Sequence, residues 1–187
     1  MGEQVVILSG SPSAASRSTL VARALASEVE AAGLRTVAWA LGDFDPSDVV
    51  FGRSSTPALT RFIESVKAAA ALVLASPVYK ASYSGALKAV VDVVPPDALT
   101  GRPALGIATA RLPAHGPEVD RAYRALFSFF KARAVDTLVV LDDEVNVGAP
   151  SAGGSSGVLG PAEKRVRLAA RALVAAVRGV TPEAAAS

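Results

Sequence analysis

Two patterns of hydrophobic positions alternate along the chain. Short runs of consecutive apolar residues, many of them β-branched, predict buried strands, and apolar residues three or four apart predict amphipathic helices. We expect strands at 5–8, 34–41, 71–75, 104–108 and 137–141. We expect helices at 17–32, 57–70, 86–94, 118–133 and 161–178, and an irregular segment at 45–56.

This alternation of short apolar strands with helices predicts an α/β fold with a parallel sheet covered on both faces. By analogy with flavodoxin-like chains of this length, we expect a doubly wound, three-layer α/β/α fold with five strands in the order 2-1-3-4-5. Strand 34–41 then lies at or near an edge. One domain should span residues 1–179, with a mobile Gly/Ser-rich loop at about 148–160 and a frayed tail at 180–187.

Composition narrows the classes of protein. Of 187 residues, 51% are hydrophobic and 19% are charged, which argues for a compact core and against disorder. The net charge of +2 and the spread of Lys and Arg argue against nucleic acid. There is no cysteine, one histidine, no run of apolar residues that could cross a bilayer, and no basic, apolar leader. We therefore expect a cytoplasmic protein with no membrane partner.

In a doubly wound sheet, ligands bind beyond the carboxyl ends of the strands, where the winding reverses. This predicts binding loops at 9–19, 76–84 and 109–117. The first is rich in hydroxyls and carries one cation, Arg17, so it suits a phosphate at the N-terminus of the following helix. It lacks the Walker and dinucleotide fingerprints. An ordinary β–α turn with Ser16 or Ser18 as the N-cap is the alternative that the sequence leaves open.

The segments Gly10-Ser11-Pro12, Ser16-Arg17-Ser18 and 76–88 resemble the NAD(P)H-dependent FMN reductases, and in particular the branch that serves alkanesulfonate and methanesulfonate monooxygenases. The likeness extends from about Val5 to Leu141 and is most specific in 76–88. It implies hydride transfer from NADPH or NADH to FMN, with no proton-transfer residue supplied by the protein. It also implies homodimers or homotetramers, formed through the helix after residue 85 and its neighbour, and a flavin-dependent monooxygenase as a possible partner.

The resemblance assigns flavin binding to positions in all three loops. The candidate cofactor-binding residues are Ser9, Ser11, Ser16, Arg17, Ser18, Pro77, Val78, Tyr79, Lys80, Ser84, Thr109, Ala110 and Arg111. Ala110 and Arg111 stand where the family has Gly-Gly, which either weakens flavin binding or points Arg111 toward a nicotinamide-nucleotide phosphate. Arg53 and Lys80 are further candidate cations for that phosphate.

Other interpretations stay open at this point. The chain is alternatively a flavin-retaining quinone or azo reductase, or a flavodoxin-like protein with a decayed flavin site. For His115 we favour a solvent-facing or helix-capping role over catalysis, and for 142–144 a solvated acidic turn over a cation site. Phe127, Phe129 and Phe130 span more than one helix face, which suggests contact with another subunit.

Overall fold

The computed structural model of this protein describes residues 3–13, 15–148 and 157–179. Its centre is a parallel five-stranded sheet in the order β2-β1-β3-β4-β5, as the sequence predicts. The strands are β1 (Gln4–Ser9), β2 (Arg35–Ala40), β3 (Ala71–Pro77), β4 (Pro103–Ala110) and β5 (Arg133–Leu141). The helices are α1 (Arg17–Ala31), α2 (Pro46–Val50), α3 (Pro57–Ala68), α4 (Gly85–Asp92), α5 (Gly116–Phe129) and α6 (Gly160–Arg178).

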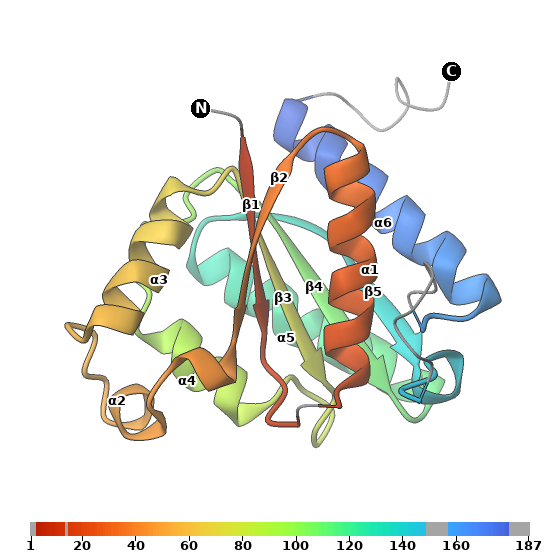
Figure 1. Cartoon of the computed structure of the whole chain (residues 1–187), viewed down its shortest axis with the longest axis horizontal. Helices are drawn as coiled ribbons and strands as arrows, with labels where there is room; N and C mark the ends of the chain where they lie inside the picture. Colours follow the sequence, from red (N-terminus) through yellow and green to blue (C-terminus); the bar gives the residue numbers. More distant parts are fainter. Residues whose placement is uncertain (1–2, 14, 149–156, 180–187) are drawn as a thin grey trace.

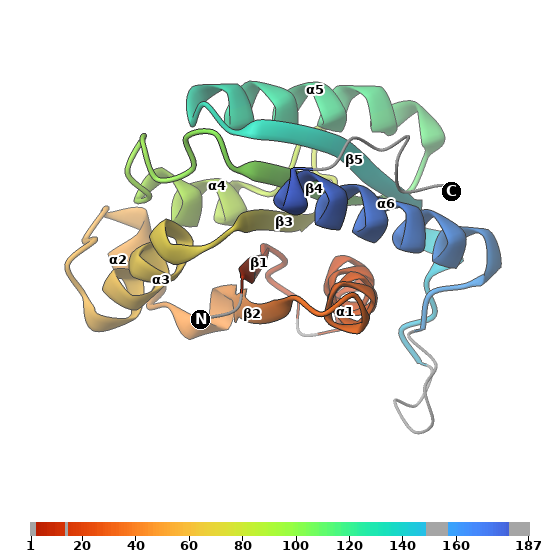
Figure 2. The ribbon, with the colours of Figure 1, turned by 90° about the horizontal axis from the view of Figure 1, so that it is seen from above.

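Two apolar cores fill the spaces between the sheet and its helices. Helices α1 and α6 cover one face, with Leu25 and Leu173 fully buried against the sheet. Helices α3, α4 and α5 cover the other face, where Phe62 and Phe127 are buried. Figure 2 shows these two layers on opposite sides of the strands. The central strands are apolar on both sides because neither side meets water.

The carboxyl ends of the strands gather at one rim of the sheet, at the bottom of Figure 1. Parallel strands joined by helices on both faces must all end at the same rim. The loops that follow β1, β3 and β4 therefore lie next to one another, although they are far apart in the sequence. Strand β2 is at the sheet edge, as predicted, and its residues are mostly exposed or half-buried.

The main differences from the sequence expectation lie in two regions of the chain. The segment 45–56 is not wholly irregular, because Asp45 caps α2 by accepting a hydrogen bond from the Ser47 amide, 2.8 Å away, and Pro46 opens the helix. A hydrogen bond from the Ser47 hydroxyl, with the one from the amide, lowers the pKa of Asp45. Helix α5 ends at Phe129 and β5 begins at Arg133, before the predicted Thr137, because the amide of Arg133 pairs with the Arg102 carbonyl at 2.8 Å.

A β-bulge interrupts the pairing of β4 with β5. Between Leu105 and Ile107, the pairing of β4 with β5 shifts by one residue, and β5 holds the extra residue. Opposite the shift, Gly106 leaves room for the buried ring of Tyr123, because a Cβ on this glycine would lie 2.4 Å from the ring. The first four residues of β5, 133–136, are exposed or half-buried, so the apolar run that predicts this strand does not include them.

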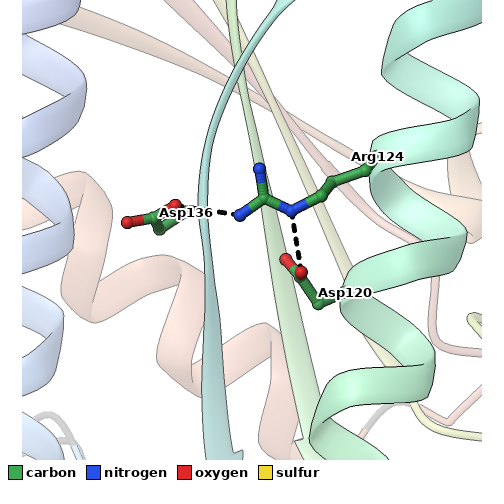
Figure 3. A network of polar contacts seen from close by, with 3 residues as sticks. All are labelled: Asp120, Arg124 and Asp136. Carbon is green, nitrogen blue, oxygen red and sulfur yellow. Dashed lines mark hydrogen bonds and ion pairs between the residues drawn. The ribbon is translucent and has the colours of Figure 1, made fainter.

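An ion-pair network attaches helix α5 to the bulged strand (Figure 3). Arg124 donates from Nε to Asp120, 2.7 Å away, and from Nη2 to Asp136 of β5, 2.9 Å away. Partial burial alone would raise the pKa of Asp120, but hydrogen bonds from Arg124 and Thr137 lower it below its usual value. The same two carboxylates raise the pKa of the Arg124 guanidinium.

The remaining expectations concern the surface and the ends of the chain. Phe127 and Phe130 are buried, and only Phe129, 64% exposed, faces outward. The predicted loop at 148–160 is joined at its base by a bridge between Val145 and Val158. Residues 149–156 within it, and the predicted tail at 180–187, lie outside the described residues. Among the described residues, no helix has both the length and the apolarity to cross a membrane.

Candidate functional site

Hydrogen bonds join the loops at the carboxyl rim directly to one another. The Gly10 amide after β1 donates to the Ala75 carbonyl of β3 at 2.7 Å, and the Val78 amide donates to the Thr109 carbonyl of β4 at 2.8 Å. Arg17 at the start of α1 donates from Nε to the Asp142 carbonyl after β5, 2.9 Å away. The rim is therefore a connected frame and not a set of independent loops.

Ser84 provides a further buried connection. Its hydroxyl donates to the Gly10 carbonyl at 2.5 Å and accepts from the Leu87 amide at 3.0 Å, so it caps α4 and holds the loop after β1. Gly10 lies so close to α4 that a Cβ there would be 2.5 Å from the Cβ of Leu87. The glycine is required by this close approach.

The loop after β1 ends in a capped helix. The Ser16 hydroxyl accepts from the Thr19 amide at 3.3 Å and contacts the Ser18 hydroxyl at 2.9 Å. Of the two capping serines that the sequence leaves open, Ser16 is the N-cap. The positive end of the α1 dipole and the side chain of Arg17 thus face the same part of the rim.

A tight hairpin follows β3. Tyr79 and Ser82 pair across the turn, with N···O distances of 2.8 and 3.1 Å, and Lys80 and Ala81 both adopt left-handed conformations, with φ of 52° and 63°. Two positive φ angles at the central residues match a type I′ turn, which glycine or asparagine usually occupies. Neither Lys80 nor Ala81 is such a residue, so this turn holds backbone strain.

The hairpin packs against a tyrosine behind it. The ring centroid of Tyr83 lies 5.2 Å from that of Tyr123, whose hydroxyl donates to the Ile107 carbonyl at 3.0 Å. Burial raises the pKa of Tyr123 far above its usual value, and a smaller effect of the same kind raises the pKa of Tyr83. Tyr123 therefore stays protonated, and Tyr83 supports the hairpin from the core.

A cleft of about 250 Å³ opens between these loops. Eight of the predicted residues line it, namely Ser11, Ser16, Arg17, Pro77, Val78, Tyr79, Thr109 and Arg111. Tyr79 is 50% exposed, so its ring is available to a ligand. The structure brings residues from three separate strand ends to one cavity, as the topology requires.

Five predicted residues do not line the cleft, and the structure shows where each of them lies instead. Ser9 bonds Thr19, and Ser18 and Ser84 are buried in the capping contacts just described. Lys80 is at the exposed tip of the hairpin. Ala110 is 1% exposed, pairs with Leu141 of β5, and does not narrow the cleft.

Four lining residues were not among the predicted set: Ser13, Ala15, His115 and Asp142. These residues lie in the loops that follow the strands, and this position could have identified them from the sequence. Asp142 follows β5, and His115 precedes α5 without a capping hydrogen bond from its side chain. His115 thus occupies the N-cap position of α5, as the capping role predicts, although its side chain makes no capping bond, and it is one of the residues that line the cleft.

The donors of this cleft fit a phosphorylated, planar ligand. Serine hydroxyls, the helix N-terminus and one guanidinium are donors for a phosphate, and Pro77, Val78 and Tyr79 offer an apolar wall for a ring. The residues present thus suit flavin mononucleotide. Among the described residues, no group of three or more histidines or carboxylates is placed to bind a metal ion.

Comparison with known proteins agrees with this geometry. The model of the NADPH-dependent FMN reductase family matches residues 4–146. The FMN reductase (NADPH) of Escherichia coli (strain K12) is 37% identical over 140 residues, which cover 75% of this chain and 73% of that protein. The NADH-dependent FMN reductase SfnF of Pseudomonas fluorescens (strain Pf0-1) is 33% identical over 132 residues, covering 69% and 71%.

A solved structure of an NADH:FMN oxidoreductase (EMOB), in its apo form, superposes with a TM-score of 0.79 at 25% identity and covers 96% of this chain and 91% of that one. An archaeal flavodoxin superposes with a TM-score of 0.62 at 9% identity over 94% of this chain and 97% of its own, which supports the fold alone. By its matched segment, its relatives and its fold, this chain belongs to the NADPH-dependent FMN reductase family.

Proposed function

We propose that this protein binds FMN in the rim cleft, reduces it with a nicotinamide nucleotide, and releases the reduced flavin to a partner monooxygenase. The observation that carries the proposal is the connected frame at the rim, which brings a phosphate seat and an apolar ring wall into one cavity. The family match supports the same reaction.

The phosphate would lie against the loop after β1. Ser11, Ser13 and Ser16 line this part of the cleft with Arg17. Only the Nε of Arg17 bonds to the described protein, which leaves the terminal N–H groups of its guanidinium for a ligand. Neutral hydroxyls and a single cation bind the phosphate moderately, as an enzyme that releases its flavin requires.

The ring would lie against Pro77, Val78 and Tyr79. The hairpin holds these residues in place because its base is bonded to Thr109 and its turn is closed by the Tyr79–Ser82 pair. When bound, FMN supplies the hydride-accepting ring, so the chemistry needs no acid or base from the protein. The chain contributes position, an apolar surface and partial exclusion of water.

The alternative of a decayed flavin site rests on the replacement of a glycine of the family by Ala110, and the position of Ala110 does not support it. This residue is buried at the end of β4 and is not among the residues that line the cleft. The long side chain of Arg111 is exposed at the mouth of the cleft. The substitution of Gly-Gly by these two residues is therefore compatible with flavin binding.

We further infer that the protein is a cytoplasmic homodimer or homotetramer that uses the outer surface of α4. An apolar groove of about 390 Å³ runs between α2 and α4, lined by Phe44, Val49 and Val90 among others. Val50 and Phe51, beside it, are 69% and 70% exposed. Burying this surface against a second copy would remove apolar area from water, and light scattering measures the resulting mass.

The test is stopped-flow loss of NAD(P)H absorbance with added FMN. The wild type is expected to oxidise NADPH or NADH in proportion to added FMN. Arg17→Gln should raise the KM for FMN about tenfold, because a charge-assisted phosphate contact is lost, and Arg61→Gln, an exposed arginine on α3, is the matched control. No turnover with either nucleotide contradicts the proposal. Tightly held flavin with ping-pong quinone reduction would instead identify a flavin-retaining quinone reductase.

A further inference from the structure

A second cationic side chain lines the cleft, in addition to the one that we assign to the flavin phosphate. Arg111 follows the last residue of β4 and lines the same cavity as Arg17. It forms no hydrogen bond or ion pair with any residue that the structure describes. Arg17, in contrast, is anchored to the Asp142 carbonyl at 2.9 Å and stands at the N-terminus of α1.

The charge of the cleft points to a second anion. Among the described lining residues, Asp142 is the sole carboxylate, and Arg17, Arg111 and His115 line the same cavity. With His115 neutral, the lining carries a net charge of +1, from two arginines and one aspartate. Because the serine hydroxyls and Arg17 suffice for one phosphate, the unengaged guanidinium of Arg111 remains for another.

We propose that Arg111 is the specificity-determining residue that recognises the 2′-phosphate of NADPH and so favours NADPH over NADH. The inference rests on the proposed function, in which a nicotinamide nucleotide enters the rim cleft. NADPH and NADH differ only in that phosphate, so discrimination needs a donor placed for it alone. The planar, permanently charged fork of arginine suits this role.

The structure also separates Arg111 from the other candidate cations. Arg53 is engaged, because it pairs with Asp48 at 3.5 Å and lies over the ring of Phe51, with 5.4 Å from Cζ to the ring centroid. It does not line the cleft. Lys80 is at the tip of the hairpin, outside the lining. Of the three, Arg111 alone lines the cavity, and its backbone is fixed one residue beyond a fully buried strand.

The test compares two probes that differ by one phosphate, adenosine 2′,5′-bisphosphate and adenosine 5′-monophosphate, by titration calorimetry without turnover. The wild type is expected to bind the bisphosphate at least about tenfold more tightly, as one charge-assisted contact supplies. Arg111→Gln should reduce this ratio to near one. Arg111→Lys should retain part of it, because lysine keeps the charge but loses the fork.

The matched control is Arg61→Gln, which removes an exposed arginine that likewise has no partner among the described residues and lies on α3, outside the cleft. It should leave the binding ratio unchanged. In steady-state kinetics, Arg111→Gln should lower the NADPH/NADH ratio of kcat/KM by the same factor, through KM for NADPH. An unchanged ratio in Arg111→Gln, or a wild type that binds both probes equally or neither, overturns the inference.

These outcomes differ from failure of the proposed function. Suppose that FMN neither binds nor turns over, while the bisphosphate still binds about tenfold more tightly than the monophosphate in an Arg111-dependent way. That result would support the nucleotide site and contradict the flavin reaction. If FMN turns over with NADPH and NADH alike in wild type and Arg111→Gln, the flavin reaction stands and the role of Arg111 falls.

Discussion

The two walls of the cleft are built from different interactions. On the wall formed by the loops after β1 and β3, buried serine hydroxyls bond backbone groups of neighbouring loops, as Ser84 does with Gly10. On the wall formed by the loop after β4, which leads into helix α5, Arg111 has no partner among the described residues. The core anchors α5, and the ion pairs that this helix adds lie at the surface. Buried neutral hydrogen bonds are costly to break, whereas exposed ion pairs contribute little.

This difference suggests that one wall of the cleft supports the site and that the other recognises the ligand. The first wall cannot move without leaving a buried carbonyl unpaired. It therefore keeps the proposed phosphate-binding loop and the apolar residues that would contact the ring in fixed relative positions. The second wall holds charges that are free to meet a ligand. Changes to the first wall should therefore destabilise the fold, and changes to the second should alter ligand choice.

The largest effect is expected at Gly10. In Gly10→Ala the new Cβ would lie 2.5 Å from the Cβ of Leu87, which is fully buried in α4. We expect the free energy of unfolding to fall by about 3 kcal/mol, because neither element can yield easily. Urea denaturation measures this change. Gly85→Ala is the control, since its Cβ would meet nothing within 4 Å, and equal stability of the two variants would show that the first wall is not tightly packed.

Ser84→Ala should have the next largest effect. It removes the cap of α4 and leaves the Gly10 carbonyl without its buried donor. The expected loss in the free energy of unfolding is about 2 kcal/mol, together with weaker FMN binding. Ser27→Ala, which removes an exposed hydroxyl from α1, should change stability by less than about 0.5 kcal/mol. A Ser84 variant no less stable than the Ser27 variant would contradict the contrast between the walls.

Ala81→Gly should stabilise the protein, because glycine accepts the φ of 63° without strain. The gain is expected to be about 0.5 kcal/mol, after the added flexibility of the unfolded chain is subtracted. Thermal unfolding, with the transition followed by circular dichroism, measures it. The control is Ala125→Gly on an exposed position of α5, which should instead cost about 1 kcal/mol. A loss of stability in both variants would mean that the hairpin turn is not strained.

The smallest effect is expected for Asp120→Asn in the ion-pair network of helix α5, which follows the second wall in the chain. Because the pKa of Asp120 is lowered in the folded protein, its contribution to stability is present above the unfolded pKa and is lost as the pH falls. The side chain keeps 32% of its surface exposed, so solvent screens the pair. The expected loss is about 0.5 kcal/mol at pH 7, vanishing near pH 2. A loss that persists in acid would exclude the charge as its cause.

Most of the fold follows from the sequence because buried parallel strands are short apolar runs. The strand order and the meeting of three loops at one rim follow from winding rules that need no side-chain detail. The start of β5 does not follow, because residues 133–136 are exposed or half-buried and form no apolar run. Helix α2 is equally hidden, since its five residues are too short for a periodic pattern and depend on the cap from Asp45.

The site is predicted less completely than the fold, for a physical reason. A sequence shows which residues follow a strand, but not which side chains turn inward. Ser84 carries the right chemistry but caps α4, and Ser18 is buried against the hydroxyl of the α1 cap, Ser16. His115 and Asp142 line the cleft because their loops end at the same rim. Only the packed structure separates these roles.

The most direct measurement is a titration of the protein with FMN and with riboflavin, which lacks the phosphate, followed by quenching of flavin fluorescence. If the loop after β1 is a phosphate seat beside the ring wall, FMN should bind at least about tenfold more tightly than riboflavin. Equal binding of the two flavins, or no binding of either, would contradict the central claim that this rim holds a phosphorylated flavin.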